Sequence, residues 1–320
     1  MAGECSMNPT RMQTKAVERF TCLGDQCPDT CCKGWGMQLT EQTVEKYKAN
    51  APHLMEAVTS GEAEFIMRRD PVTDYCVKFD AGWCGIHREF GEEYLGDACH
   101  FYPRITRALG STLVTSAALS CPETARLMLY TPSALAMTER SEVRVPYSMR
   151  NVLPAGVEEN AALSIHQIFL DIASDVAHSA AYNVMRVSAL ARAIERQAVD
   201  AWPEAVPLYL SMIESRIPEP EALPGDLFNL LHAFHGLIAA SPKQRDALKV
   251  LVQTMADALG ARFDEAGAIH LADDAATRAL RLMSHMRDQS PHLGAVMRQY
   301  VQAQLSQALF PFAGFGETLS

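Results

Sequence analysis

The second half of the chain has a pattern of apolar positions that is typical of helices. Between Leu163 and Ile172, apolar residues recur every three or four positions and would share one face of a helix. Prolines separate the segments with this spacing, and Gly260 follows one of them at the position where helices favour glycine. We therefore expect residues 161–320 to form an all-α domain. The further helical segments are 182–199, 205–216, 227–239, 246–259, 273–287 and 294–309.

The first part of the chain, up to about residue 130, has few segments of this kind. Its one expected helix is Thr40–Asn50, for which Thr40 is a suitable N-cap. Prolines after Thr131, Val145 and Leu153 then interrupt any regular pattern up to about residue 160. We predict a mainly α fold in which an irregular, cysteine-rich, metal-binding region precedes an all-α helical domain. The expected parts are an N-terminal extension (1–18), the cysteine-rich region (19–130), a connecting segment (131–160) and the helical domain (161–320).

The charge of the chain argues against one broad class of function. The sequence has 28 Lys and Arg against 38 Asp and Glu, a formal net charge of −10, and no run of basic residues. A nucleic-acid-binding protein needs a positively charged surface for the phosphates, so we predict no nucleic-acid partner. Residues 1–20 lack the apolar run of a signal peptide, and no apolar stretch reaches the about 18 residues that a membrane helix needs. We therefore predict a cytoplasmic protein with no membrane partner.

All nine cysteines fall between residues 5 and 121. In a reducing compartment, clustered cysteines bind metal more often than they form disulfides. Thiolates bind soft and borderline metals strongly, and short loops between them reduce the cost of ordering the site. Cys5 stands apart from the others. The predicted metal ligands are Cys22, Cys27, Cys31 and Cys32, spaced C-x4-C-x3-C-C, and then Cys76, Cys84, Cys99 and Cys121.

The spacing of these cysteines leaves the kind of metal centre open. Zinc sites commonly use cysteines two to four residues apart, and no C-x2-C pair occurs here. The adjacent Cys31 and Cys32 cannot both easily reach one ion, but they can serve two irons of a cluster or two separate sites. The ferredoxin run is absent, and the C-x3-C-x2-C motif of radical enzymes fails because Gly34 stands where its last cysteine would be. We favour an iron–sulfur centre, with zinc as the alternative and buried thiols or disulfides after these.

Four histidines are weaker candidates for ligands. His87 and His100 adjoin the cysteine motifs, but residues beside a metal centre more often support its ligands or lie on the surface. His232 and His235 are three positions apart on an expected helix and could face one ligand. No Glu-x-x-His pattern accompanies them, so we interpret them as hydrogen-bonding residues between helices.

The residues around the first cysteines have simpler interpretations. Asp29 and Thr30 are expected to form a turn in which their side chains bond to the backbone. Trp35 and Trp83 are expected to shield the centre from water rather than to contact a substrate.

Several short motifs of the first 130 residues, taken together and in order, resemble one known family. These motifs are Arg19-Phe20-x-Cys22, Cys27-Pro28-Asp29-Thr30-Cys31-Cys32-Lys33-Gly34-Trp35, Cys76-x7-Cys84-x-Ile86, Gly96-Asp97-x-Cys99-x-x-Tyr102-Pro103-Arg104 and Leu119-Ser120-Cys121-Pro122-Glu123-x-Ala125. They resemble the opening of the flagellin lysine N-methylase family, to which a family of cysteine-rich zinc- or iron-chelating domains is related. The resemblance covers about residues 19–126, whereas in the helical half only Tyr300 and the run 309–312 are similar.

The resemblance implies a protein-lysine N-methyltransferase that acts on flagellin, with S-adenosylmethionine as methyl donor. It also implies that the cysteines hold an iron–sulfur cluster, which we expect to be [4Fe-4S]. The chain has no Gly-rich turn of the dinucleotide-binding type, so the donor would bind through another device. One hypothesis is an open iron position that receives the amino and carboxylate groups of the donor.

The donor-binding candidates are Arg104 and Tyr102, which follow Cys99. A guanidinium there can bind the donor carboxylate through two hydrogen bonds, neutralise the thiolates or form a plain salt bridge. The catalytic residue stays unassigned, because the acceptor of the lysine proton could be Asp97, Glu123, Tyr94 or Tyr102.

Two other interpretations compete with methyl transfer. One is a non-catalytic module that chelates zinc or iron or carries a cluster. The other is a secreted disulfide scaffold, which the missing signal peptide disfavours. Members of the family continue well beyond the Phe310-Pro311-Phe312 segment, whereas this sequence stops at Ser320, so we expect either a shortened C-terminal part or a missing segment that completes the helical domain.

Overall fold

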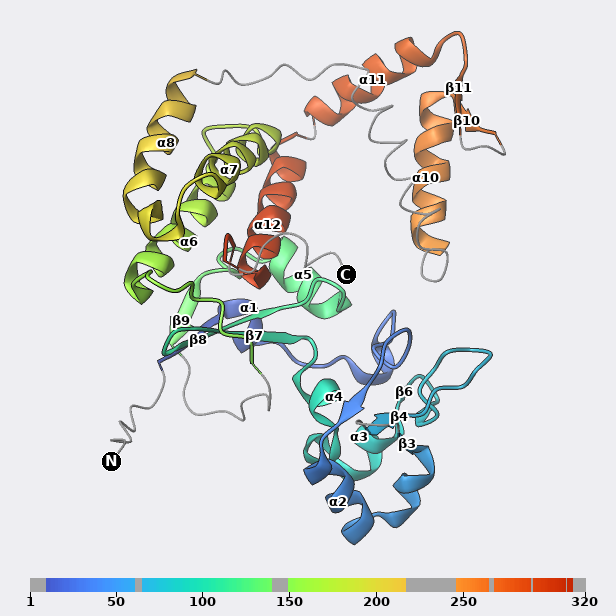
Figure 1. Ribbon diagram of the computed structural model, residues 1–320. Helices are drawn as coiled ribbons and strands as arrows, with labels where there is room; N and C mark the ends of the chain where they lie inside the picture. The colour runs from blue at the N-terminus through green and yellow to red at the C-terminus, as the bar shows by residue number, and fades with distance from the viewer. Residues whose placement is uncertain are drawn as a thin grey trace, which may run out of the picture. The chain divides into compact units, whose positions relative to one another are not determined.

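The computed structural model describes residues 10–60, 65–139, 149–216, 246–264, 268–288, 290–308 and 310–312. This part of the chain is mainly helical, as predicted, with several small sheets in addition (Figure 1). The chain divides into two compact units, Met1–Ile217 with Val296–Ser320, and Pro218–Ala295. The expected helix at 227–239, with His232 and His235, lies outside the described residues. Among the described helices, none has both the length and the apolar character needed to cross a membrane.

Four helices of the first unit form its largest apolar core. They are α6 (Glu159–Ser174), α7 (Ala180–Glu195), α8 (Trp202–Arg216) and the part of α12 (Ser290–Ala308) from residue 296 onwards. The core is built around the fully buried side chains of Phe169, Leu190 and Leu305. The expected helices agree with these within a few residues, because the three- and four-residue spacing places the buried side chains on one face. A short 3₁₀ helix, η4 (Val199–Ala201), leads into α8.

A buried arginine links two of these helices. The Arg186 side chain is 6% exposed, and its Nη1 and Nη2 lie 2.8 Å from Asp175 Oδ2 and 2.5 Å from Glu214 Oε1. Asn183 donates to the Asp175 backbone carbonyl at 2.7 Å. The two carboxylates compensate the cost of burying the guanidinium, so this charge links the middle of α7 to the last turn of α8 and to Asp175, the cap residue of α6.

A four-stranded sheet brings a strand near the N-terminus of the first unit beside strands about 100 residues later in the chain. Its strands are β7 (Arg104–Leu109), β8 (Thr112–Ala117), β1 (Arg11–Thr14) and β9 (Met137–Glu139), in that order. β1 is parallel to β8, and the other pairs are antiparallel. The hydrophobic pattern does not predict this sheet, because β1 and β9 are too short to show alternation. The strands place part of residues 1–18 and of 131–160 inside the fold, although we expected an extension and a connecting segment there.

One face of this sheet carries helices from both ends of the chain. α1 (Lys15–Arg19) and α5 (Pro122–Tyr130) pack together with Ala117 of β8 and Ala303 of α12. Ser306 of α12 lies 3.2 Å from Ser116 of β8 through their Oγ atoms, and Arg107 donates to the Gln307 carbonyl at 2.9 Å. β7 and β8 are thereby held against α12, and β7 and α5 both border the cavity described below.

The cysteine-rich region has a second, smaller core of its own. Tyr47, Met37 and Leu54 are almost fully buried there, together with Cys32 and Cys76. The expected helix is present, and the Thr40 side chain caps it by accepting the Thr43 N–H at 3.3 Å. The elements are η1 (Gly24–Gln26), β2 (Gln38–Leu39), α2 (Glu41–Asn50), η2 (Pro52–Ala57), β3 (Val58–Ser60), β4 (Phe65–Met67), β5 (Phe79–Asp80), β6 (Trp83–Cys84), α3 (Gly85–Phe90), η3 (Glu92–Tyr94) and α4 (Asp97–Phe101).

The second unit shows that the all-α prediction for residues 161–320 is wrong in one place. Between α10 (Asp246–Leu259) and α11 (Ala275–Asp288) lies an antiparallel hairpin of β10 (Ala261–Phe263) and β11 (Ile269–Leu271). Gly260 ends α10 with a φ of +64°, in agreement with its predicted role. The strands have three residues each, so no period of two could reveal them in the sequence.

Candidate metal and donor site

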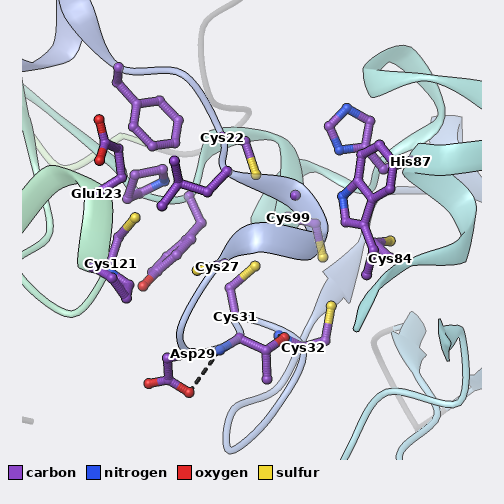
Figure 2. Close-up of a pocket in the computed structure, with 18 of the residues that line it drawn as sticks. Cys22, Cys27, Asp29, Cys31, Cys32, Cys84, His87, Cys99, Cys121 and Glu123 are labelled. Atoms are coloured by element: carbon purple, nitrogen blue, oxygen red, sulfur yellow. Dashed lines mark hydrogen bonds between the residues drawn. The ribbon is translucent and has the colours of Figure 1, made fainter. Parts of the chain in front are cut away.

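Most of the predicted metal ligands line a single cavity of about 490 Å³. Its walls include seven of the eight cysteines and both donor-binding candidates, Tyr102 and Arg104. Cys76 is the exception, since it is buried in the core of the cysteine-rich region and does not line the cavity. The lining cysteines are Cys22, Cys27, Cys31, Cys32, Cys84, Cys99 and Cys121 (Figure 2).

Three of these, which we call the inner thiols, belong to or pack against the apolar core of the cysteine-rich region. Cys32 is buried, and its carbonyl accepts the Cys76 N–H at 2.7 Å. Cys84 ends β6 and precedes α3, while Cys99 lies within α4. Figure 2 shows the sulfur atoms of Cys32 and Cys84 on the same side of the cavity. The core of the region thus fixes the positions of Cys32, Cys84 and Cys99 before any ligand binds.

The inner thiols also influence one another's ionisation. The Cys32 thiol donates hydrogen bonds to Cys84 and Cys31, and the bond to Cys84 is the main reason that the pKa of Cys84 falls to about 6. The same bonds, together with burial, raise the pKa of Cys32. Burial and the neighbouring Cys84 raise the pKa of Cys99. Thiols packed this closely cannot all ionise in the absence of a cation, because their negative charges would repel one another. A bound cation would stabilise the ionised thiols.

Three further thiols, which we call the outer thiols, stand on a segment with little regular structure. Cys22 and Cys31 are exposed and Cys27 is half-buried. Within this segment η1 is the only helical element of the described structure, and Cys27 donates its N–H to the Gly24 carbonyl at 3.2 Å. Burial raises the pKa of Cys22. In Figure 2 the Cys22, Cys31 and Cys99 sulfur atoms point towards the middle of the cavity.

The turn before Cys31 has the predicted form. Asp29 Oδ1 accepts the Thr30 N–H at 2.7 Å, and Thr30 Oγ1 accepts the Cys32 N–H at 3.0 Å. The Trp35 indole donates to the Cys31 carbonyl at 2.7 Å. These bonds direct Cys31 and Cys32 to neighbouring positions on the cavity wall.

The arrangement of the donors bears on the kind of metal they suit. Among the described residues, no group of three or more His, Cys, Asp or Glu side chains is placed to hold a metal ion. Tetrahedral zinc would need thiolates about 3.8 Å apart, since each lies about 2.3 Å from the ion. Cys32 is hydrogen-bonded to both Cys31 and Cys84, and four further thiols line the same cavity. By number and chemistry these thiols could serve a single zinc ion or a centre of several irons, so the donor set is compatible with both.

The donor-binding candidates border the same cavity. The Tyr102 hydroxyl lies 3.2 Å from Ser120 Oγ, and burial raises the pKa of Tyr102 to about 12. Arg104 begins β7, its guanidinium stacks over the Phe20 ring at 5.3 Å, and its Nη1 donates to the His100 carbonyl at 3.4 Å. Cysteines and a guanidinium thus meet in one partly enclosed space.

The other candidates from the sequence divide into those at the cavity and those away from it. His87, His100, Asp29, Trp83 and Glu123 line the cavity, whereas Trp35, Tyr94 and Asp97 do not. The Glu123 carboxylate accepts two hydrogen bonds from Arg126, which keep its pKa below the usual range.

Several lining residues were not proposed as site residues from the sequence, among them Phe20, Glu92 and Ser120. Phe20 and Ser120 stand two positions and one position from a cysteine, which is the signal that could have indicated them. Glu92 has no such neighbour and is recognised only in the folded chain.

Comparison with known proteins identifies relatives over part of the chain. No known family profile matches the sequence, and no solved structure matches it. A lysine-N-methylase of Salmonella typhimurium (strain LT2) is 26% identical over 149 residues, which are 43% of this chain and 37% of that protein. A lysine-N-methylase of Salmonella choleraesuis is 25% identical over the same lengths. The flagellar biosynthetic protein FliU of Salmonella muenchen is 24% identical over 159 residues, 47% of this chain and 92% of that protein. The chain thus matches little more than a third of the length of the two methylases.

Proposed function

We propose that this chain, a relative of the lysine-N-methylases, transfers methyl groups from S-adenosylmethionine to lysine side chains of flagellin, with an iron–sulfur cluster in its thiol-lined cavity. The observation that carries the proposal is the meeting of seven cysteines with Tyr102 and Arg104 around one cavity of about 490 Å³. The names of the relatives support methylation of lysine, and the match to FliU supports a flagellar substrate.

The thiols would hold the cluster and the guanidinium would hold the donor. When bound, a cluster with an open iron position would supply a site for the amino and carboxylate groups of the methionine part of the donor. Arg104 would bind the same carboxylate through two hydrogen bonds, as guanidinium groups do with planar anions. Both contacts would orient the methyl group within the cavity.

The reaction itself requires a neutral amine. The lysine ammonium first gives one proton to water. The neutral nitrogen then attacks the methyl carbon, the carbon–sulfur bond breaks with its electron pair returning to the sulfur, and the products are S-adenosylhomocysteine and the methylated ammonium. Two side chains at the cavity have suitable roles towards the lysine. The Glu123 carboxylate, kept ionised by Arg126, would attract the ammonium group as it enters. The Tyr102 phenol, with a pKa of about 12, would stay protonated at neutral pH and orient the amine by a hydrogen bond.

The direct test is methylation of purified flagellin by the anaerobically purified protein. We expect S-adenosylmethionine and this protein to add methyl groups to lysines, read by mass spectrometry of tryptic peptides. A matched reaction with S-adenosylhomocysteine should leave the lysines unmodified. If the metal-loaded protein adds no methyl group while it retains its cluster, methyl transfer to flagellin is excluded.

A non-catalytic metal-binding or cluster-carrying module is the second candidate. It is favoured by the partial match, since the shared part is 37% of the methylases and could serve one step of their work. Binding of S-adenosylmethionine separates the two, because a carrier has no need of the donor. Equilibrium dialysis with the radiolabelled donor should show one donor per chain for a methyltransferase and none for a carrier.

A further inference from the structure

The guanidinium of Arg104 is held on one edge and on one face. Its Nη1 atom donates to the His100 carbonyl at 3.4 Å and lies 3.9 Å from Glu92 Oε1, both long distances for such contacts. The face of the guanidinium makes the stronger contact. Its central carbon lies 5.3 Å from the centroid of the Phe20 ring, which is within the range of a cation–π interaction. The aromatic ring is therefore the main support of the guanidinium plane.

The opposite edge of the same group is available. Within the described structure, Nε and Nη2 of Arg104 have no hydrogen-bond partner, and Arg104 lines the cavity. The Nε–Nη2 edge is one of the two edges with which a guanidinium binds a carboxylate through two parallel hydrogen bonds. The contact with Phe20 leaves this edge open while it fixes the plane in which the edge lies.

Phe20 is itself well anchored. It caps the C-terminal end of α1, where its N–H donates to the Val17 carbonyl at 3.4 Å. Its half-buried ring packs against the apolar cluster of α1, α5 and β8. The ring also lines the cavity, two positions before Cys22. A side chain held from behind in this way can set the position of the group stacked on its other face.

We propose that Phe20 is a positioning residue that holds the Nε–Nη2 edge of Arg104 ready for the carboxylate of the methyl donor. This inference rests on the proposed role of Arg104 in donor binding. Phe20 would touch neither the metal nor the methyl group, and it would act only through the guanidinium. It would also lower the entropy cost of binding, because a long arginine side chain would already be ordered.

The test compares Phe20→Leu with Phe20→Tyr. Leucine keeps an apolar side chain for the cluster behind it but has no aromatic face, and tyrosine keeps both. The first readout is the dissociation constant for S-adenosylmethionine by equilibrium dialysis, with iron per chain measured on the same samples. The second readout needs no donor: it is the rate at which phenylglyoxal modifies Arg104, followed by peptide mass spectrometry.

We expect Phe20→Leu to weaken donor binding about three- to tenfold and to speed modification of Arg104, with iron content unchanged. Phe20→Tyr should restore both values to within about twofold. Equal donor affinity and equal modification rates in Phe20→Leu and the unmodified protein would overturn the proposal, as would loss of iron in Phe20→Leu. If the unmodified protein binds no donor, the proposed donor chemistry fails, and faster modification of Arg104 in Phe20→Leu would still establish the positioning role.

Discussion

The inner and outer thiols face the same cavity from two very different supports. Cys32, Cys84 and Cys99 belong to a region with its own apolar core around Tyr47, whose hydroxyl donates to the Tyr94 carbonyl at 2.7 Å. Cys22, Cys27 and Cys31 stand on a segment whose described backbone bonds are mostly local turns. Three of the seven lining thiols are therefore placed by the fold, and three others would gain their order from the metal.

This difference shows how a small apolar core can support a metal site with many thiol ligands. Holding all the thiols rigidly in the absence of metal would place several partial charges and large sulfur atoms at close quarters. The mutual effects on Cys32, Cys84 and Cys99 already show this, because the pKa of Cys84 falls only while that of Cys32 rises. If the segment of the outer thiols becomes ordered only when the metal binds, the unfavourable crowding of thiols arises only when a cation is present to compensate it.

Loss of one inner thiol should have the largest effect. Cys84→Ser should remove most of the metal, because the hydrogen bond from Cys32 lowers the pKa of Cys84 to about 6 and so favours its thiolate, and a thiolate ligand contributes its share of the binding free energy. Metal per chain is measured after anaerobic purification. Cys5→Ser is the matched control and should keep full occupancy. Full occupancy in Cys84→Ser would remove this residue from the ligand set.

Removal of the metal should separate the two supports directly. In the stripped protein, amides of residues 21–31 should exchange with deuterium at least about tenfold faster than in the loaded protein. Amides of α3 and α4 should change less, because the core of the region holds them. Hydrogen exchange followed by mass spectrometry measures both segments in one experiment. Equal changes in the two segments would show that the contrast between inner and outer thiols is false.

The stability of the stripped protein should distinguish one inner from one outer thiol. Cys32→Ser should lower the free energy of unfolding by about 1–2 kcal/mol, because a polar hydroxyl replaces a thiol that is 7% exposed in an apolar core. Cys22→Ser should change it by less than about 0.5 kcal/mol, since Cys22 is exposed. Urea unfolding of both stripped variants gives the values. A larger loss for Cys22→Ser than for Cys32→Ser would reverse the comparison.

The smallest expected effect lies away from both sets of thiols. Glu159 of α6 accepts hydrogen bonds from Ser111 and Thr112 at the β7–β8 turn, and these bonds outweigh burial to keep its pKa below the usual range. Its contribution to stability is therefore complete above the unfolded-state value of about 4.3 and is lost as the pH falls through the lower folded-state value.

Glu159→Gln should lower the free energy of unfolding by about 1 kcal/mol at pH 7, with a smaller difference towards pH 3, and should leave metal content unchanged. Urea unfolding at several pH values measures this. A difference that stays constant between pH 7 and pH 3 would contradict the assigned hydrogen bonds.

Periodicity predicted the described helices of the second half well because their buried side chains recur at a fixed spacing, whereas α1, α3, α4 and α5 of the first part, with five to nine residues each, were not predicted. The helix that begins after Thr40 and the end of α10 at Gly260 were also predicted, since both depend on local capping rules. The β10–β11 hairpin and the strands β1 and β9 were missed because three or four residues carry too little pattern, and the six-residue strands β7 and β8 do not alternate strictly between apolar and polar residues. Pairing of Arg11–Thr14 with β8 depends on residues about 100 positions away, which no local rule indicates.

The cysteine pattern predicted most of the cavity but not its inner and outer supports. Spacing alone placed Cys76 with the other ligands, whereas the fold buries it behind the cavity wall. Glu92 became visible only when η3 brought it near Arg104 and His100. The kind of site can therefore be inferred from the residue types. Which side chains line the cavity, and from which element, depends on contacts between distant parts of the chain.

The central claim is that these thiols together hold one iron–sulfur centre, and metal analysis tests it most directly. The protein would be purified without oxygen and its iron, acid-labile sulfide, zinc and visible absorption measured on one sample. We predict about four irons and four sulfides per chain, with a broad absorption band near ~400 nm. A colourless protein that contains only zinc would contradict the account.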